Sequence, residues 1–132
     1  MLVKDTKVIF FDKSLKNVQD IIVGDKVKTK YGNKAVIEVS SQTEATRKFI
    51  FSDGFKIVVS NSQEFLLPTN EWKKVSELNE GDTIAKLDNN FAKIVDITDL
   101  VENQGVIIRT EDNKGVMLSN GMMVRWKKIV PF

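Results

Sequence analysis

The stretch Leu15-Lys-Asn-Val-Gln-Asp-Ile-Ile-Val-Gly-Asp-Lys-Val27 returns 57 residues later as Trp72-Lys-Lys-Val-Ser-Glu-Leu-Asn-Glu-Gly-Asp-Thr-Ile84. Four positions are identical, and they are Lys16/Lys73, Val18/Val75, Gly24/Gly81 and Asp25/Asp82. A repeat at a fixed offset indicates a structure built from similar units. We therefore predict two similar halves, centred on residues 15–27 and 72–84, within one compact domain.

Composition limits both the size and the chemistry of this domain. The chain has 132 residues and contains neither cysteine nor histidine. That length fits a single domain, residues 1–132, with a core large enough to fold without disulfides or metals. The missing residue types exclude thiol nucleophiles, imidazole acid–base catalysis and the common zinc sites. We predict no cofactor and no metal, since the tight Asp-rich loop of a calcium site is also missing.

The distribution of apolar and charged residues bears on location and partners. No apolar run reaches the roughly 18–20 residues of a membrane span, and residues 1–5 do not resemble a signal peptide. We therefore expect an intracellular, cytoplasmic protein without a membrane partner. The net charge is only +2, but residues 125–132 form a basic tail that contains Arg125, Lys127 and Lys128. Such a tail is typical of a solvated surface, and it could also dock on an acidic partner.

The periodicity of the sequence predicts an all-β protein with little helix. Residues 7–11, 26–31, 35–39, 48–51 and 55–59 are short apolar or alternating runs rich in β-branched and aromatic residues. Residues 91–103 form a longer stretch of the same type. Asp53-Gly54 predicts a two-residue hairpin of type I′. Residues 18–21 and 75–78 have room for one helical turn each before their Gly-Asp bends.

Three motifs resemble those of the Hint (hedgehog/intein) domain family. Residues 4–25 resemble the N-terminal splicing motif, residues 55–82 the second motif with its trailing strand, and residues 106–124 the C-terminal motifs. The resemblance covers the chain from Met1 to Trp126. It implies a compact, horseshoe-like all-β fold with pseudo-twofold symmetry, as the repeat independently suggests.

The same resemblance places substitutions at the positions that carry out splicing. Met1 stands where the family has a thiol or hydroxyl nucleophile, and a thioether has no proton to lose. In the second motif Ser60 is kept, but Gln63 replaces a histidine that protonates the leaving nitrogen. Lys114 stands where a further histidine is frequent. The terminal His-Asn pair is replaced by Arg125-Trp126, which lacks the amide that cyclises. We therefore predict neither splicing nor autocleavage, and no catalytic residue.

The main functional hypothesis is a structural or protein-binding module, in a phage or mobile-element protein. Its partner would be another protein or another part of a larger assembly, and a phage-encoded chain would be virion-associated. Met117 and Met123 alternate as core residues do. The proposed binding surface lies near the basic tail. It comprises Met122, Arg125, Trp126, Lys127 and Lys128.

Two alternatives belong to other functional classes. One is a nucleic-acid-binding module similar to an SH3-like barrel, with Lys26, Lys28 and Lys30 on one strand face and Tyr31 as a stacking group. The other is residual autoproteolysis at Ser60 or Asn120. Ser60 lacks a general base, and Asn120 precedes Gly121 as a turn residue does. The sequence makes no prediction about the oligomeric state.

Overall fold

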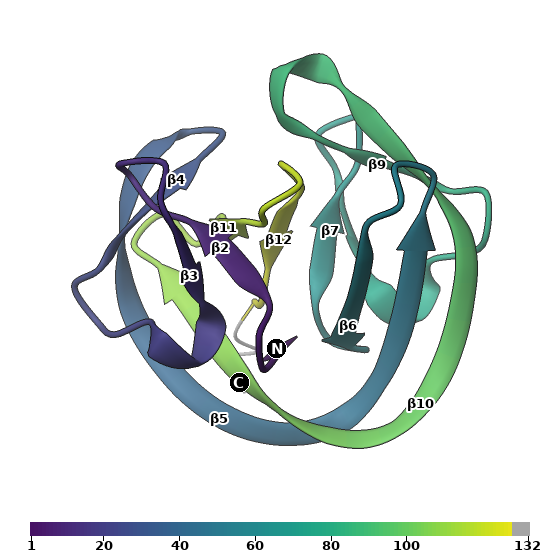
Figure 1. The fold of residues 1–132 in the computed structure, drawn as a ribbon, viewed down its shortest axis with the longest axis horizontal. Helices are drawn as coiled ribbons and strands as arrows, with labels where there is room; N and C mark the ends of the chain where they lie inside the picture. Colours follow the sequence, from purple (N-terminus) through teal and green to yellow (C-terminus); the bar gives the residue numbers. More distant parts are fainter. Residues whose placement is uncertain (128–132) are drawn as a thin grey trace, which may run out of the picture.

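The computed structural model describes residues 1–127, which fold into an all-β horseshoe with two arms (Figure 1). The strands are β1 (Leu2–Val3), β2 (Lys7–Ile9), β3 (Leu15–Asn17), β4 (Lys26–Thr29), β5 (Gly32–Phe51), β6 (Lys56–Ser60), β7 (Glu64–Leu66), β8 (Trp72–Lys74), β9 (Thr83–Ala85), β10 (Phe91–Thr110), β11 (Val116–Met117) and β12 (Met123–Arg125). Three short 3₁₀ segments interrupt them, η1 (Val18–Asp20), η2 (Val75–Glu77) and η3 (Leu87–Asn89). The predicted all-β class and horseshoe shape are confirmed.

Two strands of 20 residues each, β5 and β10, form the frame of the horseshoe. They pair antiparallel from Ile94↔Phe51 to Thr110↔Val36, and Figure 1 shows them curving together around the base. The shorter strands complete three sheets, ordered β4-β5-β6-β1-β10-β9, β11-β12-β7-β8 and β2-β3. No helix in residues 1–127 is long and apolar enough to cross a membrane.

The prediction of residues 91–103 as a strand is confirmed, and β10 continues to Thr110. The division of residues 35–39 and 48–51 into separate strands was wrong, because both belong to β5. The polar residues between them pair with β10, for example Ser41 with Val106 and Thr43 with Gln104. This middle part of the β5–β10 ribbon is mostly exposed, and backbone hydrogen bonds between the two strands hold it. Its sequence therefore lacks the alternation of apolar and polar residues that predicts a half-buried strand.

The two arms repeat one local structure around the Gly-Asp bends. Gly24 and Gly81 have φ angles of 95° and 89°, a conformation that disfavours side chains other than glycine's. The N–H of Gly24 donates to the carbonyl oxygen of Val36 (2.9 Å), and that of Gly81 donates to Ile94 (2.8 Å). Each bend therefore attaches its short 3₁₀ segment to one of the long strands. The predicted single helical turns are confirmed as η1 and η2.

The aspartate of each bend closes it with its side chain. Asp25 Oδ2 accepts the N–H of Ile22 (3.0 Å), and Asp82 Oδ2 accepts the N–H of Asn79 (2.9 Å). A lysine from the preceding strand pairs with each carboxylate, at 3.3 Å for Lys16–Asp25 and 3.6 Å for Lys73–Asp82. The residues conserved between the two repeats are therefore those that build the bend.

The core draws its buried residues from both arms and from the long strands β5 and β10. Phe49, Phe51 and Phe65 are fully buried, and their ring centroids lie 5.5–6.3 Å apart. A smaller cluster contains Met117 and Met123, as predicted. Met122 is also completely buried, in the main core. Its assignment to a binding surface was wrong, because the turn at residues 119–122 leads the chain inward one residue before β12 begins.

The turn between β5 and β6 differs from the predicted type I′ hairpin. Phe51 N–H donates to Phe55 O (2.9 Å), which leaves three residues, 52–54, in the loop. Of these only Gly54 has a positive φ, at 85°. A type I′ turn requires positive φ at both central residues, whereas a three-residue loop needs it only at the last. Asp53 instead accepts the N–H of Phe55 (2.9 Å) through its side chain.

Candidate functional site

Residues from both ends of the described chain meet at the turn between β6 and β7. β1 pairs with β6 through Leu2↔Val59, which brings Met1 to the end of β6. β12 pairs with β7 through Arg125↔Glu64. Residues 60–64 therefore lie between Met1 on one side and Arg125 on the other.

The nitrogen of Met1 is held by two side chains from this turn. It donates hydrogen bonds to Ser60 Oγ (2.7 Å) and to Gln63 Oε1 (2.5 Å). The N–H of Ser60 donates in return to the Met1 carbonyl oxygen (3.1 Å). All three residues are buried, with exposed fractions of 0%, 0% and 3% for Met1, Ser60 and Gln63. The turn therefore forms hydrogen bonds with both the nitrogen and the carbonyl oxygen of Met1.

A chain of hydroxyl groups links this nitrogen to a carboxylate. Ser60 Oγ lies 3.1 Å from Ser62 Oγ, which donates to Glu44 Oε1 (2.9 Å). Burial lowers the pKa of the free Met1 amine to about 5, and the Glu44 charge opposes part of that shift. The amine is therefore neutral at pH 7, as expected for a group removed from water without a contacting counter-charge. Sequence reasoning missed Glu44, because no motif joins residue 44 to the second splicing motif, and it missed Ser62, which lies inside that motif, because its contact with Glu44 was not foreseen.

The side chain of Met1 points away from this polar cluster. A β-carbon built at Gly105 would lie 2.9 Å from Met1 Sδ, so the thioether packs closely against the backbone of β10. Gly105 leaves the room that this side chain occupies. Met1 therefore contributes an apolar anchor and no reactive group.

At the other side of the turn, Arg125 contacts a carboxylate and an aromatic ring. Its Nε lies 3.1 Å from Glu64 Oε1, and both side chains are mostly buried, at 17% and 12% exposed. Its guanidinium also lies 4.5 Å from the centroid of the Trp72 ring. Trp126 is half-buried and Lys127 is exposed, while Lys128 lies outside the described residues. Of the predicted tail surface, only Trp126 and Lys127 are therefore placed where a partner could reach them.

Solved structures of inteins have this arrangement of strands. The gp41-1 intein matches with a TM-score of 0.83 and 23% sequence identity, over 96% of this chain and 97% of that one. The Ssp DnaB mini-intein variant M86 matches with a TM-score of 0.84 and 12% identity, over 97% and 95%. The chain has the intein fold. The bacterial intein-like domain from Clostridium thermocellum also matches, with a TM-score of 0.79 and 15% identity over 96% and 97%.

No protein-family model matches this sequence, and no curated protein sequence matches it. At these identities the structural comparisons establish the fold. Function then has to be argued from the residues at the site.

Within the intein fold, the remaining predicted positions lie apart from the Met1 cluster. Lys114 Nζ lies 4.2 Å from the centroid of the Tyr31 ring, in a cation–π contact. Tyr31 also packs against the smaller apolar cluster, so its ring is not a free stacking platform. Asn120 occupies a turn, where its Oδ1 accepts the N–H of Met122 (3.3 Å). Its predicted turn role is confirmed.

The predicted row of three lysines on one strand is shorter than expected. Lys26 and Lys28 alternate along β4 with buried residues, but β4 ends at Thr29. Lys30 lies in the following turn, and its Nζ donates to Asn70 Oδ1 (2.8 Å) of the other arm. The prediction that all three share one face was therefore wrong, because the chain reverses direction through Lys30 and Tyr31.

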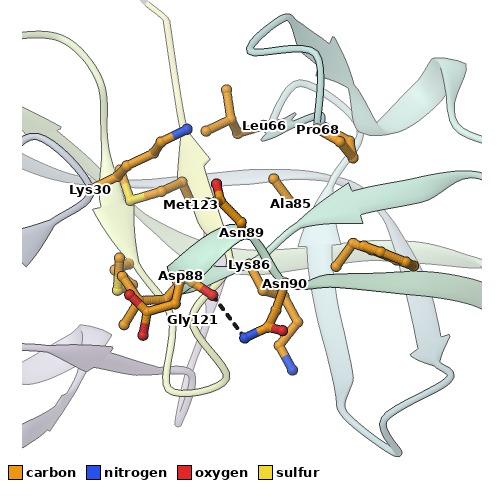
Figure 2. A pocket seen from close by; sticks show the side chains of 13 residues that line it. Lys30, Leu66, Pro68, Ala85, Lys86, Asp88, Asn89, Asn90, Gly121 and Met123 are labelled. Carbon is orange, nitrogen blue, oxygen red and sulfur yellow. Dashed lines mark hydrogen bonds between the residues drawn. The ribbon is translucent and has the colours of Figure 1, made fainter.

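A cavity of about 400 Å³ opens between the tips of the two arms. Figure 2 shows Lys30 reaching in from one side and the turn at Asp88 and Asn89 from the other. Leu66, Met123 and other members of the smaller apolar cluster form part of its wall. No motif could have revealed this cavity, because its lining comes from five separate parts of the chain. Within residues 1–127 no three carboxylates gather as a metal site would need.

Proposed function

We propose that this domain is a catalytically inactive intein-like domain that serves as a structural or protein-binding module. The observation that carries the proposal is the environment of Met1. Its nitrogen donates hydrogen bonds to Ser60 and Gln63, the residues of the second splicing motif in the family resemblance, yet its side chain is a buried thioether. The side chain at this position therefore cannot start the reaction.

The first step of splicing has no nucleophile in this arrangement. A side chain at this position must attack the preceding carbonyl carbon, and only a thiol or hydroxyl can do so at neutral pH. Ser60 Oγ cannot substitute, because it is completely buried and already bonded to the Met1 nitrogen and Ser62. No imidazole is available to activate it, since the chain contains no histidine.

The later steps lack their groups as well. Gln63 contacts the Met1 nitrogen, but an amide does not titrate near neutral pH and cannot deliver a proton to it. Arg125 is held by Glu64 and Trp72, and Trp126 has no side-chain amide to cyclise. Losing one acid–base group typically costs ~10²–10⁴-fold in rate, and here several are missing together.

A binding role is supported by the uneven surface of the two arms. Ile22 and Val23, beside the first Gly-Asp bend, are 63% and 60% exposed. The equivalent residues beside the second bend are Asn79 and Glu80. Both bends have the same backbone geometry, so folding alone does not require apolar residues at this rim. A protein partner that covers Ile22 and Val23 would account for the difference.

The proposal is tested by placing the domain between two flanking protein domains and measuring the intact mass. We expect only the unprocessed fusion after prolonged incubation at pH 6–8, with and without a thiol. Any cleaved or ligated product refutes the inactive assignment.

A restored variant separates a lost reaction from a lost scaffold. The four substitutions Met1→Cys, Gln63→His, Arg125→His and Trp126→Asn return the groups that the family resemblance implies. Cleavage at the junction before residue 1 is expected to recover if the hydrogen bonds to the backbone of residue 1 are intact, and Met1→Ala with the other three substitutions is the matched control. Cleavage at that same junction by the control would show that some other nucleophile operates there, whereas cleavage after residue 126 needs only the Trp126→Asn substitution.

The binding role is tested with a surface exchange. Ile22→Asn with Val23→Glu copies the second bend onto the first and should preserve folding while abolishing partner retention from host cells. Asn79→Ala with Glu80→Ala is the control, and it should retain the same partner. Equal retention by both variants would contradict the assignment of this rim.

A further inference from the structure

A second cavity, of about 370 Å³, lies between the segment that joins β1 to β2 and the β5–β6 hairpin. Four lysines line it, and they are Lys4, Lys7, Lys48 and Lys56. The only carboxylate in the lining is that of Asp5. This cavity therefore concentrates one sign of charge in a protein whose net charge is only +2.

The charges of these lysines are not compensated by the described part of the protein. None of the four lies within ion-pair distance of a carboxylate in residues 1–127. Lys7 Nζ donates to the neutral Asn17 Oδ1 (2.9 Å). Asp5 is occupied by Gln19, whose Nε2 donates to its Oδ1 (2.7 Å) and whose Oε1 accepts its N–H (2.9 Å). Lysines that converge on a concave surface in this way raise the local concentration of anions.

The β5–β6 hairpin explains why two of the lysines point to the same side. Lys48 pairs with Val58 and Ile50 pairs with Lys56, while the intervening Phe49↔Ile57 pair is buried in the core. Because side chains alternate along a strand, Lys48 and Lys56 lie together on the outer face. The hairpin thus carries its apolar side chains inward and presents two cations beside the β1–β2 segment.

The rest of the lining is apolar and includes an aromatic ring. Phe55 is half-buried, with its ring centroid 6.2 Å from that of the buried Phe51, and the half-buried Val58 continues the surface. The ring is therefore supported from behind by the core. A cationic rim above a supported aromatic ring is the combination that single-stranded nucleic acids use, with phosphates on the cations and bases on the ring.

We propose that this cavity binds single-stranded nucleic acid, with backbone phosphates on Lys4, Lys48 and Lys56 and a base against Phe55. Lysine suits this ligand because it contacts phosphate as a point charge without demanding a fixed geometry. The site does not use the contacts of Met1, so it is independent of whether the domain can splice.

The test measures the binding of a fluorescein-labelled dT12 oligonucleotide by anisotropy. We expect binding at 50 mM salt, and the logarithm of the association constant should fall with log[salt] at a slope of about −2, since three single-strand phosphate contacts contribute about −0.7 each. Lys4→Glu with Lys48→Glu and Lys56→Glu should weaken binding more than roughly tenfold and reduce the slope to about zero. Phe55→Leu should weaken binding with the slope unchanged, because it removes stacking and no charge.

The control variant carries the same change in net charge elsewhere. Lys26→Glu, Lys28→Glu and Lys34→Glu lie on the β4–β5 hairpin and line neither of the two cavities. This variant should bind dT12 within about twofold of the unmodified protein. Circular dichroism and thermal unfolding verify that both triple variants are folded.

Several results overturn the proposal. These are no binding of dT12 at 50 mM salt, equal losses in both triple variants, or unchanged binding in Phe55→Leu. Competition by poly-glutamate as strong as that by unlabelled dT12 would show attraction to any polyanion. Displacement of labelled dT12 by inorganic tripolyphosphate at the same concentration as by unlabelled dT12 would assign the cavity to a small phosphate compound.

Discussion

The two arms of the horseshoe, built around residues 15–29 and 72–85, share their backbone and differ in their surface. Each has a strand, a single 3₁₀ turn, a glycine with a φ near 90° and an aspartate that accepts an N–H three residues before it. Each also has the same lysine–aspartate pair. Val18 and Val75, which begin the turns, are both completely buried.

Outside this shared frame the arms diverge. The rim of the first bend is Ile22-Val23 and that of the second is Asn79-Glu80. The tip of the first hairpin carries Lys30 and Tyr31, whereas the second ends in the turn of η3. The comparison shows that a few core and bend residues suffice for the backbone, and that the exposed residues are free to acquire separate functions.

The largest test of this comparison removes one equivalent core residue from each arm. Ile21 and Leu78 follow the 3₁₀ turns and are 3% and 1% exposed. We expect Ile21→Ala and Leu78→Ala each to lower the free energy of unfolding by about 2–5 kcal/mol, through lost burial and the cavity left behind. Urea denaturation measures both values. A cost below about 1 kcal/mol in one arm would show that the arms do not contribute equally to the core.

The second test concerns the buried amine of Met1. In the 132-residue chain with a free amine, the folded state binds this proton only below about pH 5, whereas the unfolded state binds it below about pH 8. The free energy of unfolding should therefore fall as the pH drops from 8 to 5, by as much as about 4 kcal/mol, and level off below pH 5.

Urea titrations across this pH range measure the slope. The chain has no histidine, so no other side chain ordinarily titrates in the window. Acetylation of the amine is the control and should flatten the profile. A slope that persists after acetylation would assign the dependence to another group.

The third test addresses the glycine bends. A β-carbon at Gly24 would meet no atom within 4 Å, and one at Gly81 would meet only Lys93 Cε at 3.9 Å. Gly24→Ala and Gly81→Ala should therefore cost about 1–3 kcal/mol each through backbone conformation alone. Thermal unfolding compares them with Gly24→Asn, which should cost less because asparagine tolerates positive φ better. Equal stability of the alanine variants and the unmodified protein would refute the conformational argument.

The smallest effect is expected for the ion pairs of the bends. Asp25→Asn and Asp82→Asn keep an acceptor for the backbone N–H but remove the charge facing Lys16 or Lys73. Because these pairs are partly exposed, we expect a loss of about 0.2–1 kcal/mol that shrinks at high salt. Denaturation at 50 mM and 1 M salt measures it. A larger loss that ignores salt would mean that the amide disturbs the bend itself.

Much of the fold could be predicted because its signals are local. The repeat, the alternating strands and the Gly-Asp bends depend on residues close together in sequence. Predictions failed where contacts between distant segments decide the outcome. Met122 was predicted to lie on the surface, because strand alternation gives no information about the turn before β12. Tyr31 was predicted to have a free ring, because the lysine that covers it, Lys114, is 83 positions away in the sequence.

The candidate site likewise has residues that the sequence could predict and residues that depend on contacts between distant segments. Ser60 and Gln63 belong to one motif, and the prediction that they stand at the position of a scissile nitrogen rested on the family resemblance alone. Glu44 and Ser62 were missed because their contact joins the middle of β5 to the β6–β7 turn. The basic cavity was missed because its lysines come from three separate stretches of sequence.

By itself, the sequence determined the all-β class, the two similar halves and the absence of cysteine and histidine, because periodicity, repetition and composition need no knowledge of contacts. The tertiary structure alone decided that the Met1 nitrogen lies between Ser60 and Gln63, that the methionines are buried, and that four lysines surround one cavity. These features depend on the pairing of β1 with β6 and on the curvature of β5 and β10. Such pairings close long loops, and their side-chain contacts leave no periodic pattern in the chain.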